Sequence, residues 1–134
     1  MPLTAEHIEF WKDFICTECQ FPAPDRLRAQ FLNAVPTEFC DCGCNSFELR
    51  HGIAPARSLS EPTPSKVNFV FEADFRLGIE GKSLEILLFT DGDGYLTSIE
   101  IDCNGNSEPV PGLTEAVGGP YHLRASPRLL SDNV

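Results

Sequence analysis

Basic residues are scarce in this chain of 134 residues, which has 10 Lys and Arg against 20 Asp and Glu and a formal net charge of -10. The few cations are scattered along the sequence and form no run. Because a nucleic-acid-binding surface requires clustered Lys and Arg, the composition argues against DNA or RNA as a partner. An acidic protein attracts cationic partners, although a solvated acidic surface without any partner has the same composition.

Long apolar segments are also absent. No apolar run approaches the roughly 20 residues that a membrane-spanning helix requires. The segment from Met1 to His7 has neither the basic nor the apolar region of a signal peptide. We therefore expect a cytosolic protein with no membrane contact, in which clustered cysteines are more often metal ligands or redox groups than disulfides.

Recognisable catalytic motifs are missing. The sequence contains no Gly-x-Ser-x-Gly, no phosphate-binding glycine loop and no His-Glu-x-x-His. The segment from Asp91 to Tyr95 resembles the start of a calcium loop, but Leu96 stands where that loop requires glycine, so a hairpin turn is the simpler interpretation. No catalytic residue is indicated, and a non-enzymatic protein is the better expectation.

Cysteine, in contrast, is concentrated in two groups near the N-terminus. Cys16 and Cys19 form a Cys-x-x-Cys pair, and Cys40, Cys42 and Cys44 follow within one short loop. Two pairs of thiolates suit the tetrahedral coordination of structural zinc. We predict a zinc ion bound by Cys16, Cys19, Cys42 and Cys44, with Cys40 as the spare thiol.

The same cysteines allow other interpretations. Cys40 or His51 can replace one of the four predicted ligands. Cys19 continues the apolar stripe of a helix and Cys103 the buried face of a strand, as free buried thiols do. A redox-active pair at Cys16 and Cys19 is disfavoured, because the pair falls near a helix C-terminus, where the helix dipole does not stabilise a thiolate.

Helical periodicity dominates residues 1–39. Apolar side chains at helical spacing predict a helix over residues 4–19, with Thr4 as the N-cap. A second helix is predicted over about residues 24–35, with Pro36 ending it.

Residues 40–103 hold the cysteine loop and a run of alternating apolar and polar residues, which is typical of strands with one buried face. The predicted strands are residues 46–51, 67–77, 83–88 and 95–103. Hairpin-length connections permit only antiparallel pairing. The prediction is one α+β domain over residues 1–134, with two N-terminal helices packed on an antiparallel meander of about four strands and an extended Pro/Gly-rich tail at 104–134.

The two faces of this predicted sheet differ in chemistry. The residues expected to share the buried face of the long strand are Val67, Phe69, Phe71, Ala73, Phe75 and Leu77. The opposite, polar face gathers Glu72, Asp74, Glu85, Glu100 and Asp102 around Arg76. Val70, Leu87 and Phe89 interrupt that polar face, and such apolar residues are either covered by the tail or form a binding patch.

Two short motifs carry a resemblance to known proteins. They are Cys40-Asp41-Cys42-Gly43-Cys44 leading into Phe47-Glu48-Leu49, and Asp93-Gly94-Tyr95-Leu96-Thr97-Ser98-Ile99-Glu100-Ile101 followed by Pro109-Val110-Pro111. With them, residues 40–111 resemble a group of short, uncharacterised bacterial proteins. The second motif also resembles the final hairpin of some immunity proteins that neutralise secreted bacterial toxins. The resemblance implies no catalytic residue.

These features together predict a non-enzymatic cytosolic binding or interaction protein with a structural, cysteine-ligated zinc. The acidic sheet face would suit a basic partner, such as a toxin. Two alternatives remain open: a small enzyme that uses the thiols or the acidic sheet face, and a metal-free structural domain.

Overall fold

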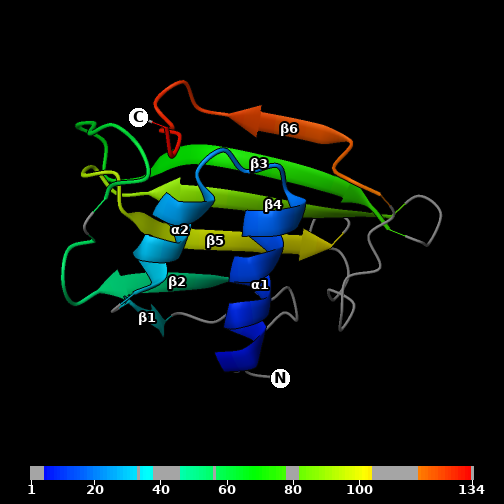
Figure 1. Ribbon diagram of the computed structural model, residues 1–134, viewed down its shortest axis with the longest axis horizontal. Coiled ribbons are helices and arrows are strands. Elements are labelled where there is room, and N and C mark those ends of the chain that lie inside the picture. The colour runs from blue at the N-terminus through cyan, green and yellow to red at the C-terminus, as the bar shows by residue number, and fades with distance from the viewer. Residues whose placement is uncertain are drawn as a thin grey trace.

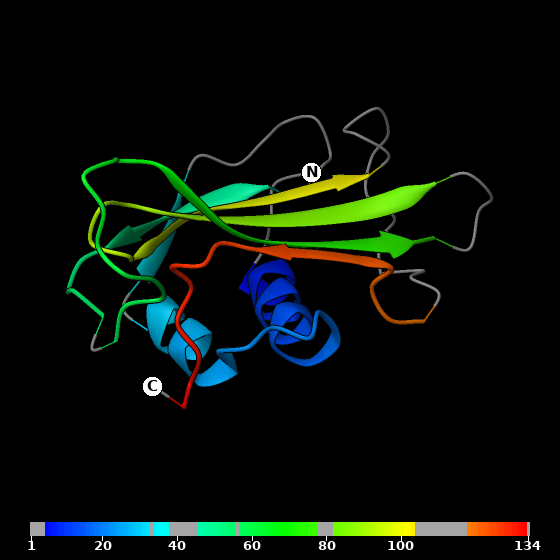
Figure 2. The ribbon, with the colours of Figure 1, turned by 90° about the horizontal axis from the view of Figure 1, so that it is seen from above.

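An antiparallel sheet of six strands carries two helices on one of its faces in a computed structural model of the chain (Figures 1 and 2). The structure describes residues 5–32, 34–37, 46–55, 57–77, 82–103 and 118–133. The elements are α1 (Ala5–Glu18), α2 (Pro24–Phe31), β1 (Ala34–Thr37), β2 (Phe47–His51), β3 (Asn68–Arg76), β4 (Ser83–Thr90), β5 (Leu96–Cys103) and β6 (His122–Ala125). The α+β class with an antiparallel sheet is confirmed, but the prediction of about four strands is wrong.

The strands lie in the order β1-β2-β5-β4-β3-β6, and every neighbouring pair is antiparallel. β3, β4 and β5 form the long meander that the alternation predicts. β1 and β6 are the two edge strands (Figure 1). Neither described helix is long and apolar enough to cross a membrane.

The two additional strands arise from long-range pairing. α2 ends at Phe31, and Leu32 already has an extended backbone, so the predicted continuation of this helix to residue 35 is wrong. Val35 and Pro36 instead pair with β2, at a sheet edge where proline is tolerated because no partner needs its missing N–H. At the other edge, β6 is built from the predicted tail, which pairs with β3 through four residues.

Both helices cover the same face of the sheet, and the core lies between the helices and the sheet (Figure 2). Phe14 of α1 packs against Phe75 of β3 with 5.2 Å between ring centroids, and Phe21 packs edge-on against Phe71 at 4.9 Å. The fully buried side chains of this layer include Trp11, Ile15, Leu27, Leu84, Ile86, Leu88, Ile99 and Ile101.

A β-bulge changes the faces of β3. Phe69 pairs with Phe89, but Phe71 pairs with Leu88, so Val70 is the extra residue between them. Val70 is consequently buried at 1% exposure, whereas Val67 is 71% exposed. The prediction that Val67 and Phe69 share the buried face with Phe71 is therefore wrong, since the bulge reverses the alternation at this point.

The last residues of the chain fasten α2 to the rest of the domain. The carboxylate of Asp132 accepts hydrogen bonds from the backbone N–H groups of Asp25 and Arg26, at 2.8 and 3.0 Å. These N–H groups lie in the first turn of α2, where no intrahelical acceptor exists. By contrast, Tyr121 and Leu123, two apolar residues of the same segment, are both exposed.

Candidate functional site

The predicted zinc ligands are described only in part. Cys16 lies in the last turn of α1, and its thiol donates to the carbonyl oxygen of Pro24 at 3.6 Å. Cys19 follows the helix and is fully buried in the core, and burial raises the pKa of both thiols. Cys42 and Cys44 lie outside the described residues, as does Cys40. The zinc site stays a prediction, and the burial of Cys19 is also what the alternative of a free apolar thiol expects.

His51, the predicted substitute zinc ligand, is the last residue of β2 and is half-buried. Its Nε2 donates to the carbonyl oxygen of Leu96 at 2.6 Å, while Nδ1 is buried and has no hydrogen-bond partner. β2 and β5 pair only through Phe47 and Glu48. Beyond this pairing, a hollow of ≈ 520 Å³ is lined by Thr37, Glu48, Leu49, Arg50, His51, Ala54, Asp91, Tyr95 and Thr97.

The second group of candidate residues is the set of acids on the sheet face away from the helices. Strand register aligns Asp74, Glu85 and Asp102 in one row across β3, β4 and β5, and it places Glu72 and Glu100 in the adjacent row, on either side of Leu87. The sequence prediction that these five acids gather on one face is confirmed. We call Glu72, Asp74, Glu85, Glu100 and Asp102 the acidic face.

The environment of the acidic face disfavours the ionised form of several of its carboxyl groups. Burial raises the pKa of Asp74 to about 6, against the opposing effect of its hydrogen bond with His122, and the nearby carboxyls of Glu72 and Glu85 add to the rise. Burial also raises the pKa of Glu100 and of Asp102. Among the described residues, no ion pair reaches Glu85, Glu100 or Asp102.

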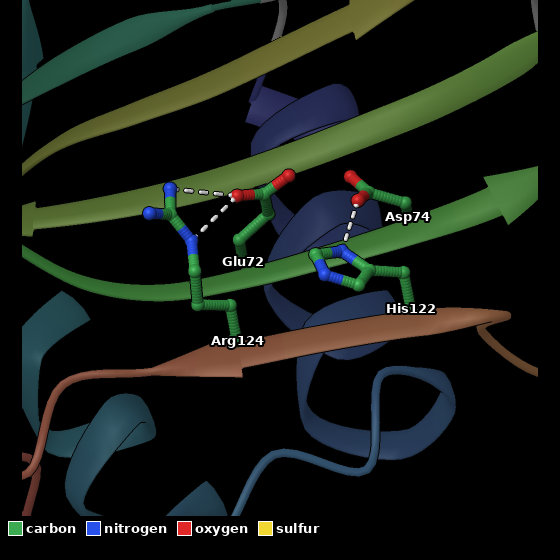
Figure 3. Close-up of polar contacts among 4 residues, drawn as sticks. All are labelled: Glu72, Asp74, His122 and Arg124. Atoms are coloured by element: carbon green, nitrogen blue, oxygen red, sulfur yellow. Dashed lines mark hydrogen bonds and ion pairs between the residues drawn. The ribbon is translucent and has the colours of Figure 1, made fainter.

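β6 supplies the cationic partners at one end of the acidic face (Figure 3). Arg124 lies opposite Glu72 and donates to its Oε1 through Nε and Nη2, at 3.2 and 2.9 Å. His122 lies opposite Asp74, with 2.7 Å between Nδ1 and Oδ2. The guanidinium group of Arg124 also stacks on Phe69, 4.2 Å from the ring centroid. Arg124 lies on the side of Glu72 that faces away from Asp74 (Figure 3).

The remaining oxygen of each buried carboxylate has no N–H or hydroxyl donor among the described residues. Oδ1 of Asp74 is buried without such a donor, and Arg124 reaches only Oε1 of Glu72, so the two carboxyls hydrogen-bond to each other when one of them is protonated. Glu72, Asp74 and His122 each offer one ligand atom, and the three atoms lie within 4.8 Å of one another. We call these three residues the β3–β6 cluster. Two carboxylates and an imidazole at this spacing can hold a proton or a metal cation.

Sequence reasoning found the two acids of this cluster and missed the histidine. The alternation of Glu72 and Asp74 on one side of β3 was the available signal. His122 lies in the predicted Pro/Gly-rich tail, which shows no periodicity that would identify a strand.

Comparisons of the chain with protein-family models, with curated proteins and with solved structures found no match. The geometry of the acidic face and of the β3–β6 cluster is therefore the basis for the functional argument.

Proposed function

We propose that the protein is a non-enzymatic binding protein whose acidic face docks a basic protein. One observation carries the proposal: Glu85, Glu100 and Asp102 lie together on adjacent strands with no ion pair to any described residue. Alternation along β4 and β5 places their side chains opposite to the buried Ile86 and Ile101, and α1 and α2 cover the face of the sheet on which those buried residues lie (Figure 2).

Charge complementarity defines the chemistry of the partner. Carboxylates with raised pKa values repel one another and are incompletely solvated, so a Lys or Arg side chain placed between them relieves both effects. Leu87 and Phe89 lie among these acids and are half-buried. They offer the apolar contact that most protein interfaces combine with charge.

A basic toxin is the partner class that the resemblance to immunity proteins suggests, and neutralisation by capping a cationic surface is the corresponding role. The bound segment would contribute its Lys and Arg side chains to the two rows of acids. Association would be fast at low salt and slower as salt screens the attraction.

The test compares two sets of three charge-removing substitutions in the full chain. E85Q/E100Q/D102N removes three acids from the acidic face, and D13N/E18Q/E61Q removes three exposed acids outside it. Both variants change the net charge equally. The probes are a lysine-rich peptide and a panel of basic globular proteins, with binding measured by calorimetry at low and at physiological salt.

We expect the acidic-face variant to bind at least roughly tenfold more weakly, and the matched control to stay within about twofold of the wild type. Equal weakening of both variants would show attraction to net charge alone. That result, or no binding by the wild type, would overturn the proposal.

The structural zinc belongs to the same proposal and has a separate test. Elemental analysis of the purified protein, with thiol titration before and after treatment with a chelator, should show one zinc and four protected thiols. No metal and six thiols with unchanged reactivity would instead favour the metal-free structural domain.

A further inference from the structure

We infer that Glu72, Asp74 and His122 form a binding site for a divalent transition-metal ion, separate from the predicted cysteine site. The inference rests on the geometry of the β3–β6 cluster and on the unpaired buried oxygen of Asp74. The site shares Glu72 and Asp74 with the acidic face, but its test uses a metal ion alone and does not require a docked partner.

The backbone positions the ligands before any ion arrives. Glu72 and Asp74 are two residues apart on β3, so their side chains project from the same face. His122 lies directly opposite Asp74 on β6, and the antiparallel register fixes this pairing. The three ligand atoms, within 4.8 Å of one another, converge from two strands whose hydrogen bonds hold them in place.

Asp74 offers a cation a buried acceptor that no N–H or hydroxyl group among the described residues uses. Asp74 is only 6% exposed, and its Oδ1 is buried without a donor. The oxygen of Glu72 that Arg124 leaves free lies on the side of Asp74 (Figure 3). Buried polar groups in folded proteins are nearly always paired. A metal ion between these carboxylates would bind Oδ1 and Oε2 at once.

The donor set defines the class of ion. Carboxylate oxygens suit hard ions such as Mn²⁺, and imidazole suits Zn²⁺ and other first-row ions. The side chain of His122 is half-exposed, so water can complete the coordination. When the ion binds Nδ1 of His122, the hydrogen bond between this nitrogen and Oδ2 of Asp74 is lost, and the neutral imidazole keeps its proton on Nε2.

Two features of the cluster oppose an ion, and they set its expected strength. Arg124 places a positive charge beside Glu72, and protons compete with the ion for the two carboxyls and the imidazole. Affinity should therefore increase with pH. The site should bind more weakly than a four-thiolate zinc site.

Mn²⁺ is the probe that separates this site from the cysteines, because thiolates select softer ions. Chelator-treated full-length protein is titrated with Mn²⁺ at neutral pH, and free Mn²⁺ is followed by electron paramagnetic resonance. We expect saturable binding of one Mn²⁺ per chain. Binding should weaken as the pH falls, because the two carboxyls and the imidazole bind the ion in their unprotonated forms.

D74N and E85Q provide the matched comparison. Each removes one carboxylate from the same row of the sheet, but only Asp74 is a proposed ligand. An asparagine at position 74 can accept from His122 and donate to Glu72, so D74N should fold. We expect at least roughly tenfold weaker binding in D74N and a change within about twofold in E85Q.

Three results would overturn the inference: no saturable Mn²⁺ binding by the wild type, equal weakening in D74N and E85Q, or full binding in D74N. If D74N does not fold, H122Q decides the question, because its half-exposed side chain can change without disturbing the core. Loss of Mn²⁺ binding in folded H122Q supports the site, and unchanged binding rejects it.

Discussion

The two faces of the sheet differ in how their side chains pack and in how well their polar groups are paired. On the face covered by α1 and α2, aromatic and aliphatic side chains pack closely, and the buried Gln30 has partners for both ends of its amide. On the acidic face, carboxylates crowd together with raised pKa values, and a buried oxygen of Asp74 has no donor. The first face supplies stability. The second retains charge at a cost in stability, which is typical of surfaces that bind something.

The largest expected effect comes from removing a ring on the helix-covered face. Phe75 is fully buried and packs against Phe14, so Phe75→Ala leaves a cavity and should lower the free energy of unfolding by about 3–5 kcal/mol. Leu87→Ala, on the acidic face, is the control and should cost about 1 kcal/mol or less, because Leu87 is only half-buried. Urea unfolding measures both. Similar losses for the two variants would contradict the division between the faces.

A smaller loss is expected where a satisfied polar contact is broken. Gln30 accepts from the N–H of Leu96 at 2.8 Å and donates to the carbonyl oxygen of Arg57 at 2.6 Å. Gln30→Leu leaves both backbone groups unpaired in the interior and should lower stability by about 2–3 kcal/mol.

Thr17→Val is the control for this prediction. It removes an exposed hydrogen bond from the Thr17 hydroxyl to the carbonyl oxygen of Asp13 and should change stability by roughly 0.5 kcal/mol or less. An equally small effect of Gln30→Leu would show that water can replace the lost contacts.

The contrast between the faces was predictable where the cause is local. Period-two alternation placed Glu72, Asp74, Glu85, Glu100 and Asp102 on one face, and the strand register confirms it. The turn at Asp91 was also predictable: its Oδ1 accepts from the N–H groups of Asp93 and Tyr95, as in a hairpin turn that does not need calcium.

What the sequence did not reveal depends on contacts between distant residues. The bulge at Val70 reverses the face of Phe69, and no local pattern announces an inserted residue in a strand. β6 exists because the edge of β3 offers unpaired backbone groups, so His122 and Arg124 reach the acids only after folding. The sequence therefore predicted two residues of the β3–β6 cluster, Glu72 and Asp74, but not His122.

In the third prediction the free energy of unfolding increases, because one substitution on the acidic face should stabilise the protein. Burial raises the pKa of Asp74 from 3.8 to about 6, so the folded chain holds this proton more tightly than the unfolded chain. This contribution to stability is complete below pH 3.8 and is lost as the pH rises through about 6. With chelator present, Asp74→Asn should be more stable than the wild type at neutral pH, by about 1–2 kcal/mol.

The measurement for this prediction is urea unfolding of both proteins at a series of pH values. The advantage of Asp74→Asn should shrink as the pH falls, because the wild-type carboxyl then becomes neutral as well. A variant that is less stable than the wild type at neutral pH would show that the charged carboxylate is well accommodated.

The smallest expected effect is the difference in stability lost when two ion pairs are broken, one on each side of the sheet. Arg124 is exposed, but the side chain of its partner Glu72 is only 11% exposed, whereas Lys12 of α1 pairs with Glu9, which is 64% exposed. Arg124→Gln removes the donors of a buried carboxylate and the stacking on Phe69, so it should lower stability by about 1 kcal/mol. Lys12→Gln should lower stability by roughly 0.5 kcal/mol or less, because water solvates Glu9 equally well.

Thermal unfolding at low and high salt measures both variants, and the loss in Arg124→Gln should persist in high salt because a buried partner is screened less. Equal losses that salt abolishes would mean that Glu72 is solvated like a surface acid, and the two sides of the sheet would then hold charge in the same way.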